Sequence, residues 1–268
     1  MKSVPRVILS ANLFTTAIVR APGATFATGL TSVDLGKPDY DLALRQHDAY
    51  CRALEACGLE LIRLSADERY PDSTFVEDTA IVTERGAVIT RPGAPSRRGE
   101  IDDIRRELGH HCSFIQIIAE PGTVDGGDVC DAGGHFFIGI SERTNETGAG
   151  QLAQVLESLG YSAGLIDIRG VGNILHLKSG LASLGGNRLV VNEALSKRKE
   201  FSRYELVHVN SAEEYAANCL WINDRVLVAA GFSGLTRQLE DLGYTTIALE
   251  MSEFQKMDGG LSCLSLRF

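Results

Sequence analysis

The stretch LTRQLEDLGYTTIAL, residues 235–249, contains the pattern that decides the fold. Leu235, Leu239 and Leu242 recur at helical spacing, Gly243 follows them, and residues 245–249 form a β-rich run. Glycine suits the end of a helix because it adopts the left-handed conformation without a Cβ penalty. The stretch therefore predicts an amphipathic helix, a glycine turn and a strand.

The same unit recurs along the chain. Helical patterns also end at Gly58, Gly109 and Gly160, and each is followed by a β-rich run, at 59–64, 113–118 and 163–168. Hairpin turns are indicated upstream of the helices, at 85–86, 133–134, 185–187 and 223–224. These turns recur about every 40 to 50 residues, a period typical of repeat architectures.

The two ends of the chain complete the repeat. The helix expected at about 41–57 has no hairpin before it, and the strand expected at 261–266 has no helix behind it. Pairing that strand with the N-terminal run 6–9 makes a fifth unit and hides exposed strand edges. We predict one domain over residues 1–268, an α/β, five-bladed propeller of ββαβ units. The unit around 193–203 lacks the helix-end glycine and is the weakest; a generic α/β sandwich is the alternative fold.

Composition limits the functional classes. The net charge of −9 argues against a nucleic-acid partner and suits a cationic small molecule. No apolar run approaches the ~18 residues of a membrane-spanning helix, and no signal-peptide core follows Met1, so we expect a cytoplasmic protein without a membrane partner. Six cysteines at irregular spacing, with no CxxC pair, predict neither a disulfide framework nor a structural zinc site.

Unusual polar residues gather where the repeat units begin. These openings are residues 72–78, 123–128, 175–179 and 258–263. In a closed propeller, equivalent positions of all blades converge near the axis. Carboxylates, a histidine and a cysteine that are far apart in sequence are therefore expected to share one pocket.

A site with these side chains could catalyse nucleophilic attack on a guanidinium group. The thiolate of Cys263 would be the nucleophile, and His176 would protonate the departing amine and then deprotonate water. Each residue also has a plainer interpretation: Cys263 and His176 as core residues, and the Asp-Gly-Gly-Asp run at 125–128 as a turn. Glu77 and Asp78 are adjacent acids inside an apolar strand pattern, and acids are costly to bury, so this pair is stronger evidence for a functional site. The pattern indicates a cysteine-centred site and names no substrate.

At these residues the chain resembles the dimethylarginine dimethylaminohydrolases, members of the pentein superfamily of guanidino-modifying enzymes. The resembling stretches are 29–32, 35–40, 71–78, 91–99, 121–128, 143–145, 175–182, 216–221 and 258–268. They cover nearly the whole chain in family order, and the five-fold pentein propeller agrees with the repeat.

The resemblance implies a reaction and a set of roles. Methylated free arginine, mono- or dimethylated, would be hydrolysed to citrulline and a methylamine through a covalent thiouronium on Cys263, with no metal or organic cofactor. His176 would be the general acid and base. Asp125 matches the acid that orients it, although bacterial relatives have glutamate there, and Asp128 is the competing candidate.

The implied substrate contacts surround these catalytic groups. Asp78, with Glu77 beside it, would hold the guanidinium, and Asp72 would lie near the α-amino group. The remaining contacts would be Arg97 and Arg143 at the α-carboxylate, Leu30 on a closing loop, and Met257 near Cys263. The glycine-bearing segment 20–29, just before Leu30, is predicted to be a mobile lid, with a plain connecting loop as the alternative.

Three other functions remain open at this stage. One is an arginine deiminase-type hydrolase, although such relatives carry an inserted helical segment for which this chain has no room. Another is a non-enzymatic propeller that binds a macromolecular surface, like the related ribosome-assembly factors. The third is a metal site at the cysteine and histidine, which lacks two further ligands at suitable spacing, although adventitious zinc at Cys263 could inhibit. A homodimer is compatible with the sequence.

Overall fold

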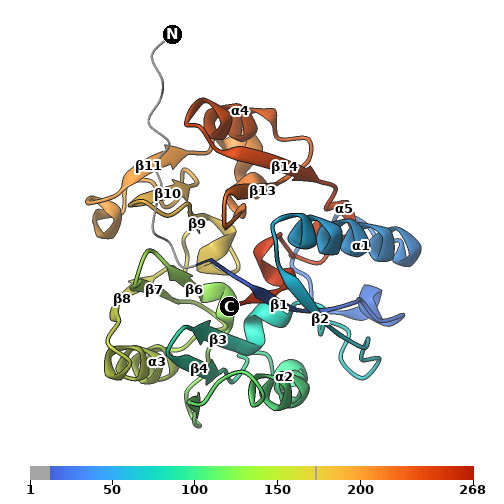
Figure 1. Cartoon of the computed structure of the whole chain (residues 1–268), viewed down its shortest axis with the longest axis vertical. Coiled ribbons are helices and arrows are strands. Elements are labelled where there is room, and N and C mark those ends of the chain that lie inside the picture. The colour runs from blue at the N-terminus through green and yellow to red at the C-terminus, as the bar shows by residue number, and fades with distance from the viewer. Residues whose placement is uncertain (1–12, 173) are drawn as a thin grey trace.

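The computed structural model describes residues 13–172 and 174–268. Five three-stranded sheets surround a common axis, and the longer helices lie on the outside (Figure 1). In each sheet the first two strands are antiparallel and the third is parallel to the second. In three of the five pairs of neighbouring sheets the first strands contact one another, which identifies the first strands as the innermost ones. This is the predicted five-bladed propeller of ββαβ units.

The blades follow one another along the chain. Four are continuous in sequence. The first consists of β3 (Ala80–Thr83), β4 (Gly86–Ile89), α2 (Ile101–Leu108) and β5 (Ile115–Ile117), and the second of β6 (Val129–Asp131), β7 (His135–Ile140), α3 (Glu146–Ser158) and β8 (Ser162–Asp167). The third consists of β9 (Leu181–Ser183), β10 (Arg188–Val191) and β11 (Glu205–His208), and the fourth of β12 (Leu220–Ile222), β13 (Arg225–Ala229), α4 (Ser233–Asp241) and β14 (Thr245–Leu249). The fifth joins β15 (Leu266–Arg267) to β1 (Thr16–Arg20), α1 (Tyr40–Ala56) and β2 (Glu60–Leu64), and the short α5 (Ser252–Gln255) precedes β15.

Pairing of the two chain ends closes the propeller. Ile18 of β1 lies opposite Leu266 of β15, and β1 continues in parallel register with β2. Closure is therefore confirmed, with two corrections. The N-terminal partner is Thr16–Arg20, whereas the predicted run 6–9 lies outside the described residues. The stretch 261–266 is also not one strand, because residues Ser262–Leu264 form a 3₁₀ turn before β15.

The helix pattern is confirmed in four blades. In α4, Leu235 and Leu239 are fully buried, and the chain turns at Gly243 with a positive φ of 89°. Gly109 is an exception, because its φ of −61° lies in the right-handed region. The unit around 193–203, which lacked a glycine, has only a 3₁₀ turn at Lys199–Phe201 in place of a helix.

Apolar side chains pack between each helix and its sheet and between neighbouring blades. In the second blade, Leu152 and Leu156 of α3 pack with Ile138 of β7, and all three are fully buried. Within the described part of the chain, no helix is long and apolar enough to cross a membrane.

Candidate active site

Each blade begins with a short 3₁₀ turn just before its first strand. These turns are η2 (Val76–Thr79), η4 (Gly126–Asp128), η5 (Leu177–Ser179), η7 (Ser211–Ala217) and η8 (Ser262–Leu264). Asp78 lies in η2, Asp125 and His176 are the N-cap residues of η4 and η5, and Cys263 lies in η8. The turns bring side chains separated by up to 185 positions into contact, as between Glu77 and Ser262.

The sequence placed two of these groups in strands, and that was wrong. Glu77 and Asp78 are in a turn, and so is Cys263. A turn suits them better, since buried acids need donors and turns leave backbone N–H groups free. Asp78 accepts the N–H of Gly127 at 2.8 Å, and Cys263 Sγ accepts that of Gly260 at 3.4 Å.

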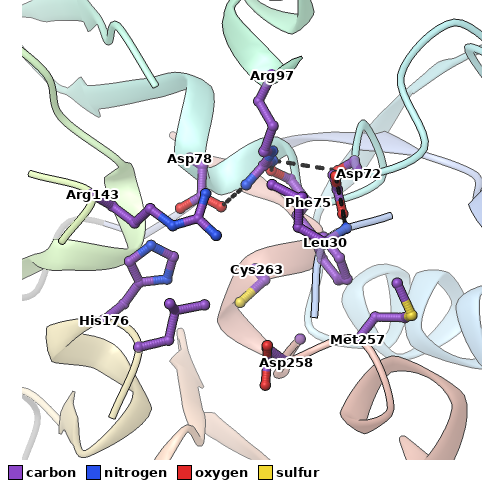
Figure 2. A pocket seen from close by; sticks show the side chains of 12 residues that line it. Leu30, Asp72, Phe75, Asp78, Arg97, Arg143, His176, Met257, Asp258 and Cys263 are labelled. Carbon is purple, nitrogen blue, oxygen red and sulfur yellow. Dashed lines mark hydrogen bonds and ion pairs between the residues drawn. The ribbon is translucent and has the colours of Figure 1, made fainter. Parts of the chain in front are cut away.

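One pocket contains most of the predicted site residues (Figure 2). Its walls include Leu30, Asp72, Asp78, Arg97, Arg143, His176, Met257 and Cys263, together with Phe75, Leu175, Asp258 and Gly259. Two predicted residues do not line it. Asp125 is fully buried behind His176, and Glu77 lines a second cavity on which Cys263 and His176 also border.

Asp125 is the hydrogen-bond partner of the histidine. Its Oδ2 lies 3.1 Å from Nε2 of His176, and its Oδ1 accepts the N–H of Gly93 at 2.8 Å. Asp128 instead accepts the hydroxyls of Ser141 and Thr144, at 2.6 and 2.7 Å. Its other oxygen accepts the backbone N–H that follows His176. Asp128 therefore hydrogen-bonds the backbone next to His176, and Asp125 hydrogen-bonds the imidazole ring itself.

Burial and charge set the protonation states of the site. Burial alone would lower the pKa of His176, but the neighbouring carboxylates, Asp78 first, outweigh it and raise that pKa to about 9. For Cys263, burial raises the pKa of the thiol to about 12, and the charges of Glu77 and Asp78 add to the rise. Near neutral pH the unliganded site holds a neutral thiol and an imidazolium.

Arg97 is almost saturated by protein partners. Its Nε and Nη2 donate to Glu100, and its Nη1 donates to Asp78 at 2.6 Å. Nη2 also reaches the carbonyls of Asp72 and Phe75, so few of its five N–H groups remain for a ligand. Burial raises the pKa of Asp78, but the charges of Arg97 and His176 outweigh it and lower that pKa to about 2. Asp78 is therefore a fixed anion in the pocket wall.

Arg143 is the available cation. Its guanidinium points into the pocket, and within residues 13–172 and 174–268 it has neither a hydrogen bond nor an ion pair (Figure 2). Across the pocket, Asp72 accepts the backbone N–H of Leu30 at 3.0 Å. The pocket thus offers a zwitterionic ligand one cation, Arg143, and two carboxylates, Asp72 across from it and Asp78 on its own side (Figure 2).

The acids and the histidine also lie close enough to suggest a metal site. One ligand atom from each of Asp78, Asp125 and His176 falls within 4.8 Å of the others. The carboxylates, however, already accept bonds from Arg97, Gly127, Gly93 and His176 itself. This geometry fits a hydrogen-bonded acid–base group better than a metal cage.

Sequence reasoning missed the residues behind the nucleophile. Glu77 was expected at the guanidinium, but its carboxylate binds Lys178 at 2.6 Å, Arg267 at 3.2 Å and the hydroxyl of Ser262 at 2.7 Å. Lys178 and Asn218 stand in stretches that resemble the family, but nothing in their spacing indicated a role. Their contacts exist only once the blade openings meet.

A closed five-bladed propeller with a cysteine, a histidine and carboxylates around its axis defines a pentein. A sequence profile described as "N,N dimethylarginine dimethylhydrolase, eukaryotic" matches residues 37–260. The chain belongs to the dimethylarginine dimethylaminohydrolase family. It is 44% identical to the N(G),N(G)-dimethylarginine dimethylaminohydrolase of Pseudomonas aeruginosa, over 96% of this chain and 100% of that one.

Solved structures of this family are among those similar to the chain, and two of them contain a ligand related to arginine. One is the Pseudomonas aeruginosa enzyme as a cysteine-to-serine mutant complexed with citrulline; the other is a dimethylarginine dimethylaminohydrolase whose histidine-to-glycine variant forms an adduct with S-methyl-L-thiocitrulline. Each matches with a TM-score of 0.93 at 44% identity, over 96% of this chain and 100% of the other.

Proposed function

We propose that the protein hydrolyses the guanidinium group of Nω-methylated free arginine, giving citrulline and a methylamine through a covalent thiouronium on Cys263. One observation carries the proposal. A single pocket holds the thiol, a histidine backed by a buried carboxylate, a fixed anion at Asp78 and the cation of Arg143. The complexes of the related enzymes with citrulline and S-methyl-L-thiocitrulline support the same substrate class.

The pocket has complementary charges for each end of such a substrate. Arg143 would bind the α-carboxylate with a bidentate pair, and Arg97 would add positive charge from the same pocket wall. Asp72 and the Leu30 backbone would lie at the α-amino group. Asp78 would accept the guanidinium N–H groups, since each of its oxygens keeps a second lone pair. Met257 would pack against the ligand near Cys263.

Substrate binding itself would help to form the nucleophile. The unliganded thiol is held neutral by burial and by two carboxylates. A guanidinium placed beside Asp78 neutralises part of that negative field and puts a cation next to the sulfur. Both changes lower the thiol pKa, so the thiol releases its proton to solvent and the thiolate forms next to the reactive carbon.

The first half-reaction removes the amine. The thiolate forms a C–S bond to the central guanidinium carbon, and the tetrahedral intermediate collapses as that carbon loses its methylated nitrogen. His176, already protonated, gives its proton to the departing nitrogen, which leaves as a neutral methylamine. Asp125 keeps the ring in position and stabilises its charged form.

The second half-reaction releases citrulline. Neutral His176 takes a proton from water, and the hydroxide attacks the thiouronium carbon. The C–S bond then breaks, the sulfur leaves as thiolate and takes up the proton of the new hydroxyl group, and the oxygen becomes the ureido oxygen of citrulline. Substrate and water are thereby converted to citrulline and the amine, and the enzyme returns to its starting state.

A substrate panel tests this proposal. Plain arginine, monomethylarginine and both dimethylarginines would be compared by citrulline release and by identification of the amine. We expect a methylated arginine to have the highest kcat/KM. Faster turnover of plain arginine would assign the chain to deiminase-type chemistry, and no citrulline from any member would favour a binding protein.

Residues 30–37, and not the segment 20–29 that the sequence suggested, have the features of a lid at the mouth of the pocket. Segment 20–29 is anchored, because Phe26 is 1% exposed and packs on Phe75 and Phe254. Residues 30–37 are exposed and held mainly by polar contacts, such as the N–H of Ser32 on Asp258. We infer that this part opens and closes. Its amide hydrogen exchange should slow when S-methyl-L-thiocitrulline is bound, and unchanged exchange would contradict a lid.

We also infer a cytoplasmic location and no nucleic-acid or membrane partner. All six cysteines are free thiols, which persist in a reducing compartment. The net charge of −9 disfavours binding to nucleic acid, which is itself an anion. Fractionation of the source cells, with the protein followed by citrulline-forming activity, tests the location.

A further inference from the structure

Ser262, the residue before the nucleophile, is 3% exposed and has every polar group engaged. Its backbone N–H donates to Oδ1 of Asn218 at 2.9 Å, and its hydroxyl donates to Glu77 at 2.7 Å. Its carbonyl accepts Nη1 of Arg267 at 3.2 Å. The backbone that carries Cys263 is therefore fixed from three sides.

Asn218 is the centre of this arrangement. Its amide nitrogen donates to the carbonyl of Lys178 at 2.9 Å and to the hydroxyl of Ser262 at 3.1 Å. The amide has only one orientation that works, because a backbone N–H faces one end and a backbone carbonyl faces the other. A Cβ on Gly260 would lie 2.4 Å from Oδ1 of Asn218, so the nucleophile loop approaches the amide as closely as glycine allows.

The same amide reaches the turn that carries the histidine. Lys178 is in η5, which His176 caps, and Ser179 of that turn hydrogen-bonds the backbone N–H and carbonyl of His176. Asn218 lies directly after η7 and before β12, in the blade between the one that η5 opens and the one that η8 opens. One side chain thus joins the nucleophile turn to the general acid and base turn.

We propose that Asn218 is a positioning residue that sets the Cys263 turn relative to the His176 turn. The inference rests on the proposed function, because it takes these two residues as the reacting pair. Asn218 borders the second cavity, which Cys263 and His176 also border, and it is not among the residues that line the pocket expected to hold the substrate. Its loss should therefore weaken the chemical step and leave substrate binding nearly intact.

The test is Asn218→Asp, which keeps the shape and the acceptor but removes the donor. It also adds a carboxylate beside Glu77 and Cys263. A small misplacement of reacting groups can cost about 100-fold in rate. We expect kcat to fall on the order of 100-fold with KM changed less than about threefold, and alkylation of Cys263 by iodoacetamide to require higher pH.

Asn223→Asp is the matched control. Asn223 is also a bridging amide: it accepts the N–H of Phe14 and donates to the carbonyls of Phe14 and Cys57, so it joins two blades, and it lines neither cavity. This variant should lose thermal stability while kcat and the alkylation profile stay at wild-type values. Equal losses of kcat in the two variants would show a general structural effect and overturn the proposal.

Ser262→Ala provides a second test if Asn218→Asp does not fold. It removes the hydroxyl contacts with Glu77 and Asn218 and keeps the backbone bond to Asn218. We expect a smaller fall in kcat, about tenfold, with the same direction of change in the alkylation profile. Unchanged kcat and an unchanged profile would overturn the positioning role. Alkylation needs no substrate, so these outcomes stay separable from a wild-type protein that fails to release citrulline, which would refute the proposed function.

Discussion

The charge state of Cys263 decides how the site can work. A thiol pKa raised to about 12 by burial and by Glu77 and Asp78 leaves little thiolate at neutral pH, while His176 is already protonated. Before substrate binds, the general acid His176 is therefore protonated and Cys263 is an unreactive thiol. A bound cation would convert that thiol to the reactive thiolate. Such a site avoids reaction with neutral electrophiles.

Alkylation measures this directly. The rate of inactivation by neutral iodoacetamide should climb steadily from about pH 7 to about pH 10, because only the thiolate reacts. A cationic haloacetamidine should inactivate faster at neutral pH than its reactivity with a free thiol predicts. Cys263→Ser is the control for labelling at other cysteines. An iodoacetamide profile that levels off near pH 7 would contradict the raised thiol pKa.

The two buried aspartates near His176 should have different roles, Asp125 in catalysis and Asp128 in stability. Asp125→Asn keeps the packing but removes the charge that faces the ring, so kcat should fall by about 100-fold or more. Asp128→Asn leaves the hydroxyls of Ser141 and Thr144 and the N–H of Leu177 with a poorer acceptor, so it should mainly lower the melting temperature. Steady-state kinetics and thermal melts of both variants check this. The reverse pattern would make Asp128 the histidine's functional partner.

At this scale, family resemblance and not residue spacing assigned Asp72 and Arg143 to the site, and both line the same pocket as Asp78 and Cys263. The sequence did not predict what holds them in place, because the contacts of Glu77 and Asn218 join turns from different blades. Spacing along the chain contains no signal for such contacts.

At the scale of elements, the 3₁₀ turns that open the blades matter more than the strands that follow them. Periodicity located helices such as α4, since apolar spacing reports burial directly. It placed Glu77 and Cys263 in strands, because three or four residues are too few to distinguish a turn from an extended run. The segment 6–9 was chosen for its apolar composition, whereas the strand that closes the fifth blade is Thr16–Arg20.

Helix α1 contains a buried histidine that should limit stability in acid. His47 is 5% exposed, and its Nε2 has no hydrogen-bond partner among the described residues. Burial, helped by Arg63, lowers its pKa to about 4. The unfolded chain binds this proton near pH 6.5 and the folded chain does not, so the free energy of unfolding should fall between about pH 6.5 and pH 4.

His47→Gln tests this contribution by removing the titrating group. Between about pH 7 and pH 5, urea unfolding should show that the variant loses about 2 kcal/mol less stability than the wild-type protein. His208→Gln, at an exposed position, is the control and should follow the wild-type protein. Parallel pH curves for His47→Gln and the wild type would contradict the assignment.

At the scale of the whole molecule, closure makes the site depend on every blade. The pocket takes residues from openings separated by most of the chain, and β15 pairs with β1 to complete the ring. We propose that the chain unfolds as one domain, because no blade can bury its inner strand without its neighbours. The period of the repeat predicted this architecture, but the pairing register needed the structure.

One-domain behaviour can be measured by two probes. Trp221 lies in β12, and its fluorescence reports the fourth blade, while far-ultraviolet circular dichroism reports all of them. Urea transitions followed by the two signals should coincide and fit one two-state curve. A fluorescence midpoint clearly separated from the circular dichroism midpoint would show that the blades unfold independently.

The central claim is that Cys263 forms a covalent thiouronium during hydrolysis of a methylated arginine. Acid quenching during turnover, followed by proteolysis and mass spectrometry, tests it most directly. The account predicts an adduct on the peptide containing Cys263 whose mass is that of the substrate less the released amine, and no adduct in Cys263→Ser. Citrulline formation by Cys263→Ser at the wild-type rate, or an adduct on another residue, would contradict it.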